Sequence, residues 1–359
     1  MSCAWLGLPG NALSKTISQF MVFRFISGCA GGTPLALGGG KIADLTSLKQ
    51  RASAMTLFSP RPAHRGFVAE AIGWRWTFWL LAIVGGALAT AAAAIMRETH
   101  PKVLLERKAQ YLRASTGNQD FVSKLASTDT ASRILTQALV RPITLLLRSP
   151  ILLVISLYVA LVFGLLYILF TTFSPVFEGK YGFTTSTSGL VYLGLGIALL
   201  FDVLLFGALN MRVQAAVLKA SGLPRPQPEH RLVLMIILSP FVSLGMFMYG
   251  WTVHYTVHWI VPVIATTFIG FGAFFVVMPA QLYIVDLFGS EAAASALSAS
   301  LLLRYVSGTF LPLAAPKMYE TLGYGWGNTL LGFLALAFVP APILFYKYGE
   351  RLRRKTVFF

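Results

Sequence analysis

The chain has 359 residues, of which 56% are hydrophobic and 12% are charged, and its mean hydropathy is +0.70. Soluble domains carry roughly 25% charged residues, so this composition excludes an ordinary water-soluble globule. The net charge is +16, but the charges lie between long apolar runs and not along one basic face, which argues against nucleic-acid binding. Cys3 and Cys29 are the two cysteines and provide no disulfide framework. The composition indicates a polytopic membrane protein.

Eight segments are long enough to cross a bilayer, since a spanning helix needs about 20 mainly apolar residues. Six of them lack Asp, Glu, Lys and Arg, and two contain one arginine each, Arg24 and Arg304. Such long continuous runs predict an all-α bundle of membrane helices, not a barrel of strands. In chain order the segments are 17–40, 76–96, 151–177, 181–201, two spans within 232–285 that fold back near 250–251, 292–316 and 321–346.

The loops between these segments predict the orientation of the chain. Nine Lys and Arg against four acids lie in 97–148, and further basic residues lie in 202–231 and after residue 346. Because basic loops stay on the cytoplasmic side, we expect the central loop and the C-terminus in the cytoplasm. The membrane itself is expected to be the plasma membrane. The links at 174–183, 251–258 and 317–327 are nearly neutral and are expected on the opposite side. Residues 1–16 lack the features of a signal peptide.

An internal repeat relates the beginning of the chain to its end. A shift of 242 places Gly28 and Asp44 on Gly270 and Asp286, and a shift of 250 aligns 70–81 with 320–331. Repeats of this kind are typical of secondary transporters. The earlier copy is eight residues shorter, and its segment 59–66 has two prolines and two arginines where a span is expected. Proline costs a helix interior about 3 kcal/mol, and a central arginine about 2.5–3.5 kcal/mol, so we expect a broken span there.

Several stretches carry a resemblance to a known family. They are VFRFISGCAGGTPLALGGGKIADL at 22–45, GWRWTFWLLAI at 73–83, ETHPKVLLERKAQYLR at 98–113, RPITLLLRSPI at 141–151, YGFTTSTSGLVYLGLGI at 181–197, YIVDLF at 283–288 and LGYGWGNTLLGF at 322–333. Together they resemble fungal members of the major facilitator superfamily, in the twelve-span drug:proton antiporter group of multidrug and polyamine efflux carriers. The resemblance covers nearly everything after residue 17.

The resemblance implies how the chain is organised. Residues 1–16 would be a non-homologous N-terminus, and 17–96 a partial N-terminal half with spans four to six, the fifth broken at 59–66. Residues 97–148 would be the cytoplasmic central loop, 149–346 a complete six-span C-terminal half, and 347–359 a basic cytoplasmic tail. The first three family spans are then expected to be missing, as is the Gly-Pro-rich motif of the fifth.

The function implied by the resemblance is secondary active transport, with proton-coupled efflux of small organic molecules of drug, toxin or polyamine type. No GxxxxGK[ST], HExxH or GxSxG pattern occurs, so we predict no enzyme and no cofactor. The expected partners are a small-molecule substrate, protons and the lipid bilayer, with the chain as a monomer. A different class stays open: a transport-inactive fragment or remnant of such a carrier that associates with other membrane proteins.

Charged candidates follow from the resemblance and from the cost of charge in a membrane. Arg24 on the fourth span is the proton-coupling candidate, with an arginine that snorkels to the interface as the alternative. Asp44 and Asp286 are the gating candidates at the cytoplasmic ends of their spans, and the alternative is a solvated helix-end acid. Asp286 is expected to meet Arg212 or Arg231.

Polar groups on apolar spans are candidates for a substrate cavity, where they could hydrogen-bond or stack on a ligand. They are Tyr158, Tyr167, Gln281 and Tyr283, and the alternative for each is interfacial placement or helix packing. We interpret Asp202 as a helix-end charge, with a proton-carrying acid as the alternative. His254 and His258 lack a third ligand, so we predict no metal site.

Overall fold

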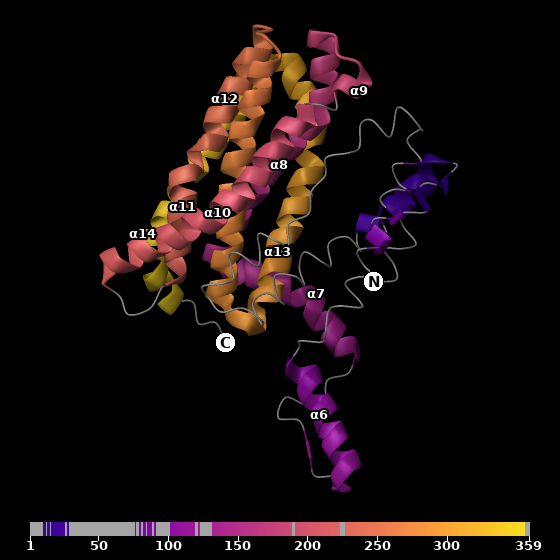
Figure 1. The fold of residues 1–359 in the computed structure, drawn as a ribbon, viewed down its shortest axis with the longest axis vertical. Helices are drawn as coiled ribbons and strands as arrows, with labels where there is room; N and C mark the ends of the chain where they lie inside the picture. The colour runs from indigo at the N-terminus through magenta and orange to yellow at the C-terminus, as the bar shows by residue number, and fades with distance from the viewer. Residues whose placement is uncertain are drawn as a thin grey trace.

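A computed structural model describes residues 101–118, 121–122, 131–188, 191–222 and 227–355, with scattered positions between 10 and 28 and between 76 and 90. The regular elements of these described ranges are all helical. In chain order they are α6 (Pro101–Thr116), α7 (Ala131–Arg148), α8 (Pro150–Tyr181), α9 (Thr185–Ser188), α10 (Val191–Ser221), η1 (Pro228–Arg231), α11 (Leu232–Leu238), α12 (Pro240–His254), α13 (Ile260–Phe338) and α14 (Pro340–Lys355). The predicted all-α bundle is confirmed (Figure 1). Segment 59–66 and most of 17–40 and 76–96 lie outside the described residues.

Five helices in the described part are long and apolar enough to cross a membrane. They are Pro150–Tyr181, Gly194–Ser221, Pro228–His254, Ile260–Gly289 and Ala292–Leu352. The last has 61 residues, and its backbone breaks at Gly323, where φ is 68°. Because 61 helical residues would extend about 90 Å, three times the hydrocarbon thickness, this break lets the segment cross twice. The described helices are therefore long and apolar enough for six crossings, with turns at both ends of the bundle (Figure 1).

Helix α8 shows how the sequence sets the ends of a span. Ser149 caps its N-terminus, where the side chain accepts a hydrogen bond from the backbone N–H of Leu152 at 3.3 Å, and Pro150 follows as the first helical residue. Gly182 ends the helix in the left-handed conformation, with φ 68°. The 32 residues between them extend about 48 Å, enough to cross the hydrocarbon core and continue into the headgroup region.

The next span lies further along the chain than the sequence predicts. We expected it at 181–201, ending before Asp202, because an acid is costly in lipid. In the structure α10 begins at Val191, continues through Asp202 and ends at Ser221. Only 1% of the surface of Asp202 is exposed, so the bundle shields it from lipid and the helix passes through it. Our interpretation of Asp202 as a helix-end charge is wrong for this reason.

The other links agree better with the sequence. The chain expected to fold back near 250–251 does so after His254, where α12 ends and Thr256 has a positive φ of 50°. Pro240 begins α12 one residue after Ser239, which follows α11. The span that starts at Pro228 is therefore built from three helical pieces, η1, α11 and α12.

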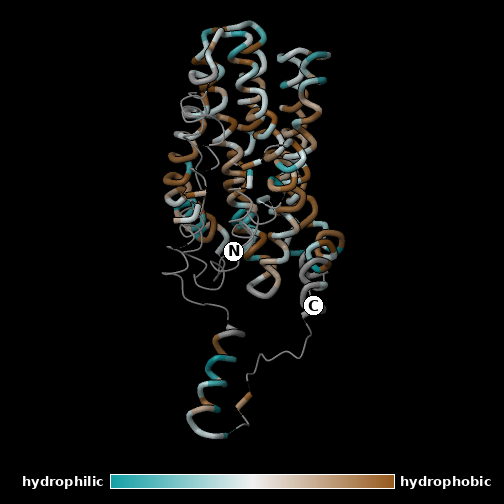
Figure 2. Tube along the Cα trace, turned by 90° about the vertical axis from the view of Figure 1, so that its right-hand side faces the viewer, coloured by the Kyte–Doolittle hydropathy of each residue, from teal (hydrophilic) through white to brown (hydrophobic). Residues whose placement is uncertain are grey.

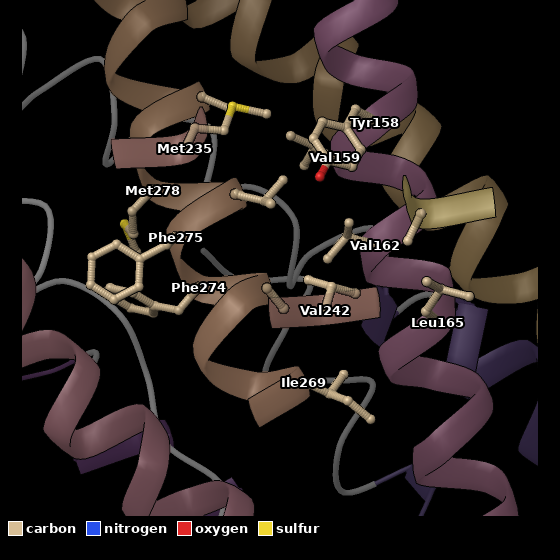
Figure 3. Close-up of a cluster of buried hydrophobic side chains, with 14 of the residues drawn as sticks. Tyr158, Val159, Val162, Leu165, Met235, Val242, Ile269, Phe274, Phe275 and Met278 are labelled. Atoms are coloured by element: carbon tan, nitrogen blue, oxygen red, sulfur yellow. The ribbon is translucent and has the colours of Figure 1, made fainter. Parts of the chain in front are cut away.

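The core of the bundle joins α8, α11, α12 and α13. Figure 3 shows Tyr158, Val159 and Val162 of α8 with side chains of the other three helices, among them Met235, Val242 and Phe275. Close approach of α12 to α13 requires glycine. A Cβ at Gly245 would lie 2.8 Å from the backbone N of Ile269, and one at Gly272 would lie 2.5 Å from that of Val242. Small residues at such crossings bring helix backbones into contact.

Hydropathy distinguishes the bundle from the segments outside it. Hydrophobic residues recur along the bundle, whereas α6 carries several hydrophilic residues and lies apart from it (Figure 2). Four of the nine basic residues of the expected central loop, 97–148, lie on α6: Lys102, Arg107, Lys108 and Arg113. Arg113 forms an ion pair with Glu106 at 3.1 Å on this exposed helix.

Candidate functional site

The two ends of the bundle differ in chemistry. At one end, which we call the basic end, α10 finishes with Arg212 and Lys219, η1 contributes Arg231, and α14 carries the basic residues of the tail. At the other, the aromatic end, the Trp251 ring lies 5.6 Å from that of Trp326, and Trp259 lies 5.8 Å from Phe183. Tryptophans are common at membrane interfaces, and basic loops confined to one end are typical of a membrane protein with a fixed orientation.

A buried ion pair lies at the basic end. The Nε of Arg231 donates to Oδ2 of Asp286 at 2.9 Å, and their side chains are 7% and 4% exposed. The sequence offered Arg212 and Arg231 as partners of Asp286, and the structure pairs it with Arg231. Arg212 is exposed on α10 and has no ion pair recorded within the described ranges. The pair ties η1 to the end of the α13 segment that precedes Gly289.

Further polar groups surround this pair. Glu229 is 3% exposed and belongs to the same short helix, η1. A Cβ at Gly349 of α14 would lie 2.9 Å from Cγ of Glu229 and 3.5 Å from the hydroxyl of Tyr283. Three elements, η1, α13 and α14, thus meet at one polar cluster inside the basic end. Movement of any of them would have to rearrange buried charges, which is costly.

A buried carboxyl group lies inside the span formed by α10. Both carboxyl oxygens of Asp202 are buried and have no hydrogen-bond partner in the described structure. One turn further on, Phe206 is fully buried against Phe274 and Phe275 of α13 at 5.8 and 5.7 Å between ring centroids. Asp202 therefore belongs to the face of α10 that packs on α13, away from the exposed neighbours Phe201 and Leu204.

A further charge, Arg304, lies on α13 among aromatic rings. Its guanidinium carbon lies 4.5 Å from the ring centroid of Phe163 on α8. The ring of Phe163 also contacts those of Tyr167 at 4.8 Å and Tyr305 at 6.3 Å. Sequence reasoning noted Arg304 as a charge within a span but did not select it as a site residue. Its partners come from a helix some 140 residues earlier, and no local pattern reveals that contact.

The four polar candidates for a substrate cavity are not gathered in one place. Tyr158 is fully buried and stacks on Phe338 at 5.6 Å, and Tyr283 is fully buried at the basic end. Both occupy packed surroundings, as the helix-packing alternative describes. Gln281 is partly buried on α13. Tyr167 is 39% exposed and lies in the aromatic group around Arg304.

Of the remaining sequence candidates, the described residues include Arg24, His254 and His258. Arg24 is exposed, and its guanidinium carbon lies 5.8 Å from the ring of Phe20. Asp44 lies outside the described residues. His254 and His258 flank the turn at the aromatic end, and the described residues contain no group of three or more potential metal ligands.

Apolar helices long enough for six crossings define a multi-pass membrane protein. The sequence profile of the Major Facilitator Superfamily matches residues 62–312, and the chain belongs to this family. Members of the family transport small molecules and are not enzymes.

Curated relatives support this assignment. The chain is 50% identical over 353 residues to MFS transporter prlG of Fungal sp. (strain NRRL 50135), covering 96% of this chain and 74% of the relative. It is 46% identical to the Trichosetin biosynthesis cluster MFS transporter of Gibberella fujikuroi, covering 96% and 67%. It is 42% identical to Efflux pump radE of Floropilus chiversii, covering 95% and 65%.

Solved structures share the fold. The proton:xylose symporter XylE matches with a TM-score of 0.62 at 16% sequence identity, covering 96% of this chain and 77% of that one. The human organic anion transporter MFSD10 matches with a TM-score of 0.62 at 15% identity, covering 95% and 75%. At these identities the likeness shows the fold.

Proposed function

We propose that this chain is a proton-coupled exporter of small organic molecules. One relative is named an efflux pump and another belongs to the trichosetin biosynthesis cluster, which supports export of a metabolite of that general size. The observation that carries the proton coupling is Asp202, a carboxyl buried inside a membrane span with both oxygens unpaired in the described structure.

The argument from Asp202 is one of solvation. An ionised carboxylate without a partner is costly in an apolar environment, and such groups within membrane spans mark ion and proton pathways. In the packed state described here, the neutral acid is the form that fits. Release of its proton requires water or a cation to reach it, and hence a rearrangement of α10 against α13. A group that exchanges its proton in one conformation and holds it in another couples proton movement to transport.

The ion pair at the basic end supplies a second element of the proposal. We place this end in the cytoplasm because basic loops are retained there. Arg231 and Asp286 then act as a latch that holds the cytoplasmic ends of two spans together, and transport would break and reform it. Arg24 remains a further candidate for proton coupling, and we propose a monomer in the plasma membrane.

Measuring transport by the purified chain after reconstitution into proteoliposomes tests this proposal. Proteoliposomes with an imposed pH gradient would be loaded with 1-naphthalenesulfonate, 1-naphthalenesulfonamide or (1-naphthyl)trimethylammonium, none of which behaves as a permeant weak acid near neutral pH. We expect gradient-dependent movement of at least one probe, its loss in Asp202→Asn, and normal movement in the exposed-acid control Glu320→Gln.

Two results would contradict the proposal. Movement that is the same with and without the gradient would exclude proton coupling. Absence of carrier-dependent movement for all three probes, in a chain that still binds them, would favour the transport-inactive alternative. Asp202→Glu keeps the carboxyl and separates loss of the proton from loss of packing.

A further inference from the structure

A cation lies halfway along a membrane crossing. Arg304 follows the turn at Gly289 by 15 residues and precedes the break at Gly323 by 19. At 1.5 Å per residue it lies about 22 and 28 Å from the two turns, near mid-height of the span. An arginine there is costly and marks a functional site by default. Secondary transporters bind their substrates at this depth.

The surroundings of Arg304 leave its hydrogen-bonding capacity largely unused. A guanidinium stays charged and carries five N–H donors. Its contact with Phe163 is made through the ring face, which uses no donor. Its Nε is buried and has no hydrogen-bond partner, and no carboxylate forms an ion pair with it in the described residues. Among the described residues, the group therefore has a positive charge without a compensating anion.

The aromatic side of the site is held rigidly. A Cβ at Gly308, one turn after Arg304, would lie 3.2 Å from the Phe163 ring and 3.6 Å from the Tyr167 ring. On the facing helix, a Cβ at Gly164 would overlap Oγ of Ser307. The two helices thus touch at glycines, and the Phe163 ring is fixed between Arg304 and Gly308.

The same group also presents open apolar surface. Tyr167 and Tyr305 are 39% and 40% exposed, although each packs on Phe163. Their rings would cover a flat apolar body while the guanidinium N–H groups bind an oxyanion. A cation, two half-exposed aromatic rings and a rigid Phe163 together match a ligand with an acidic head and an apolar body.

We propose that Arg304, Phe163, Tyr167 and Tyr305 form a binding site for organic anions with a hydrophobic body, such as carboxylates or enolates. The proposal rests on the proposed transport function, whose substrate class it specifies. Arg304 binds the oxyanion, Phe163 positions the guanidinium, and the two tyrosines contact the apolar body.

Equilibrium binding tests the site without any gradient. The full chain in lipid nanodiscs would be titrated with 1-naphthalenesulfonate and with 1-naphthalenesulfonamide, which has the same ring system and no charge. We expect tighter binding of the sulfonate. Arg304→Gln should weaken sulfonate binding roughly 10- to 100-fold, the size expected for a hydrogen-bonded charge, with little effect on the sulfonamide. Arg212→Gln removes an exposed arginine and should leave both affinities unchanged.

A second variant keeps the test valid if Arg304→Gln does not fold. Arg304→Lys keeps the charge without the planar fork, so it should keep the preference for the anion at lower affinity. The proposal is overturned if the unmodified chain fails to bind the sulfonate, if both probes bind alike, or if Arg304→Gln retains full affinity. In those cases the contact with Phe163 serves helix packing. Binding with no gradient-driven transport would refute the proposed function and leave this site standing.

Discussion

Arg231 and Asp286 are 55 residues apart in the sequence and form a buried ion pair with an Nε to Oδ2 distance of 2.9 Å. The pair connects η1 to α13 at the basic end of the bundle. Because each side chain is almost fully buried, each depends on the other for its solvation.

The first prediction concerns the stability of this pair. Removing one partner takes the opposite charge away from the other, and breaking a buried pair in this way costs about 3–5 kcal/mol. We expect Arg231→Gln and Asp286→Asn each to lower the unfolding temperature of the purified chain in detergent. The double variant should be less destabilised than the sum of the two single variants, because it removes both charges of the pair together. Arg212→Gln is the control. Single variants with the same unfolding temperature as the unmodified chain would contradict the prediction.

The second prediction uses two glycines that differ in their surroundings. A Cβ at Gly272 would lie 2.5 Å from the backbone N of Val242, whereas one at Gly207 would meet nothing within 4 Å. Gly272→Ala must push α12 and α13 apart and should cost about 1–3 kcal/mol. Gly207→Ala should instead stabilise its helix by about 0.5–1 kcal/mol. Thermal unfolding should shift in opposite directions, and equal shifts would show that the α12–α13 crossing is not tightly packed.

Sequence reasoning predicted what depends on local composition. Apolar runs gave the helical class and most of the spans, because a helix in lipid must be long and apolar whatever it packs on. Asp286 could be given candidate partners because basic residues are confined to few loops. The choice between Arg212 and Arg231 could not be made, since it depends on how the end of α10 and η1 lie against α13.

Two features were missed because they depend on packing between distant segments. The sequence predicts Asp202 at a helix end because a charge is costly in lipid. The sequence pattern does not show that packing against α13 shields this side chain from lipid. The group around Arg304 joins residues on α8 and α13, and its geometry depends on the glycine contacts between those helices. Tyr158 and Tyr167 look alike in the sequence, yet one is fully buried and the other 39% exposed.

The third prediction concerns Arg24. Its side chain is exposed, so Arg24→Ala should change stability by no more than about 0.5 kcal/mol. If Arg24 takes part in proton coupling as we propose, the same change should abolish gradient-driven movement of the naphthalene probes in proteoliposomes. Arg24→Lys keeps the charge and should retain part of the activity. Undiminished transport by Arg24→Ala would remove this residue from the mechanism.

The last prediction concerns orientation and uses two exposed turns. Gly182 ends α8 beside Phe183, whose ring contacts Trp259 at the aromatic end, and Gly222 follows α10 at the basic end. Both have positive φ, and a Cβ at either would meet nothing within 4 Å, so each turn should accept an inserted loop with a glycosylation acceptor site. If the basic end is cytoplasmic, expression in microsomes should glycosylate the insertion at Gly182 and not the one at Gly222. Glycosylation at Gly222 alone would show that loop charge does not set the orientation of this chain, and the proposed direction of transport would have to be reversed.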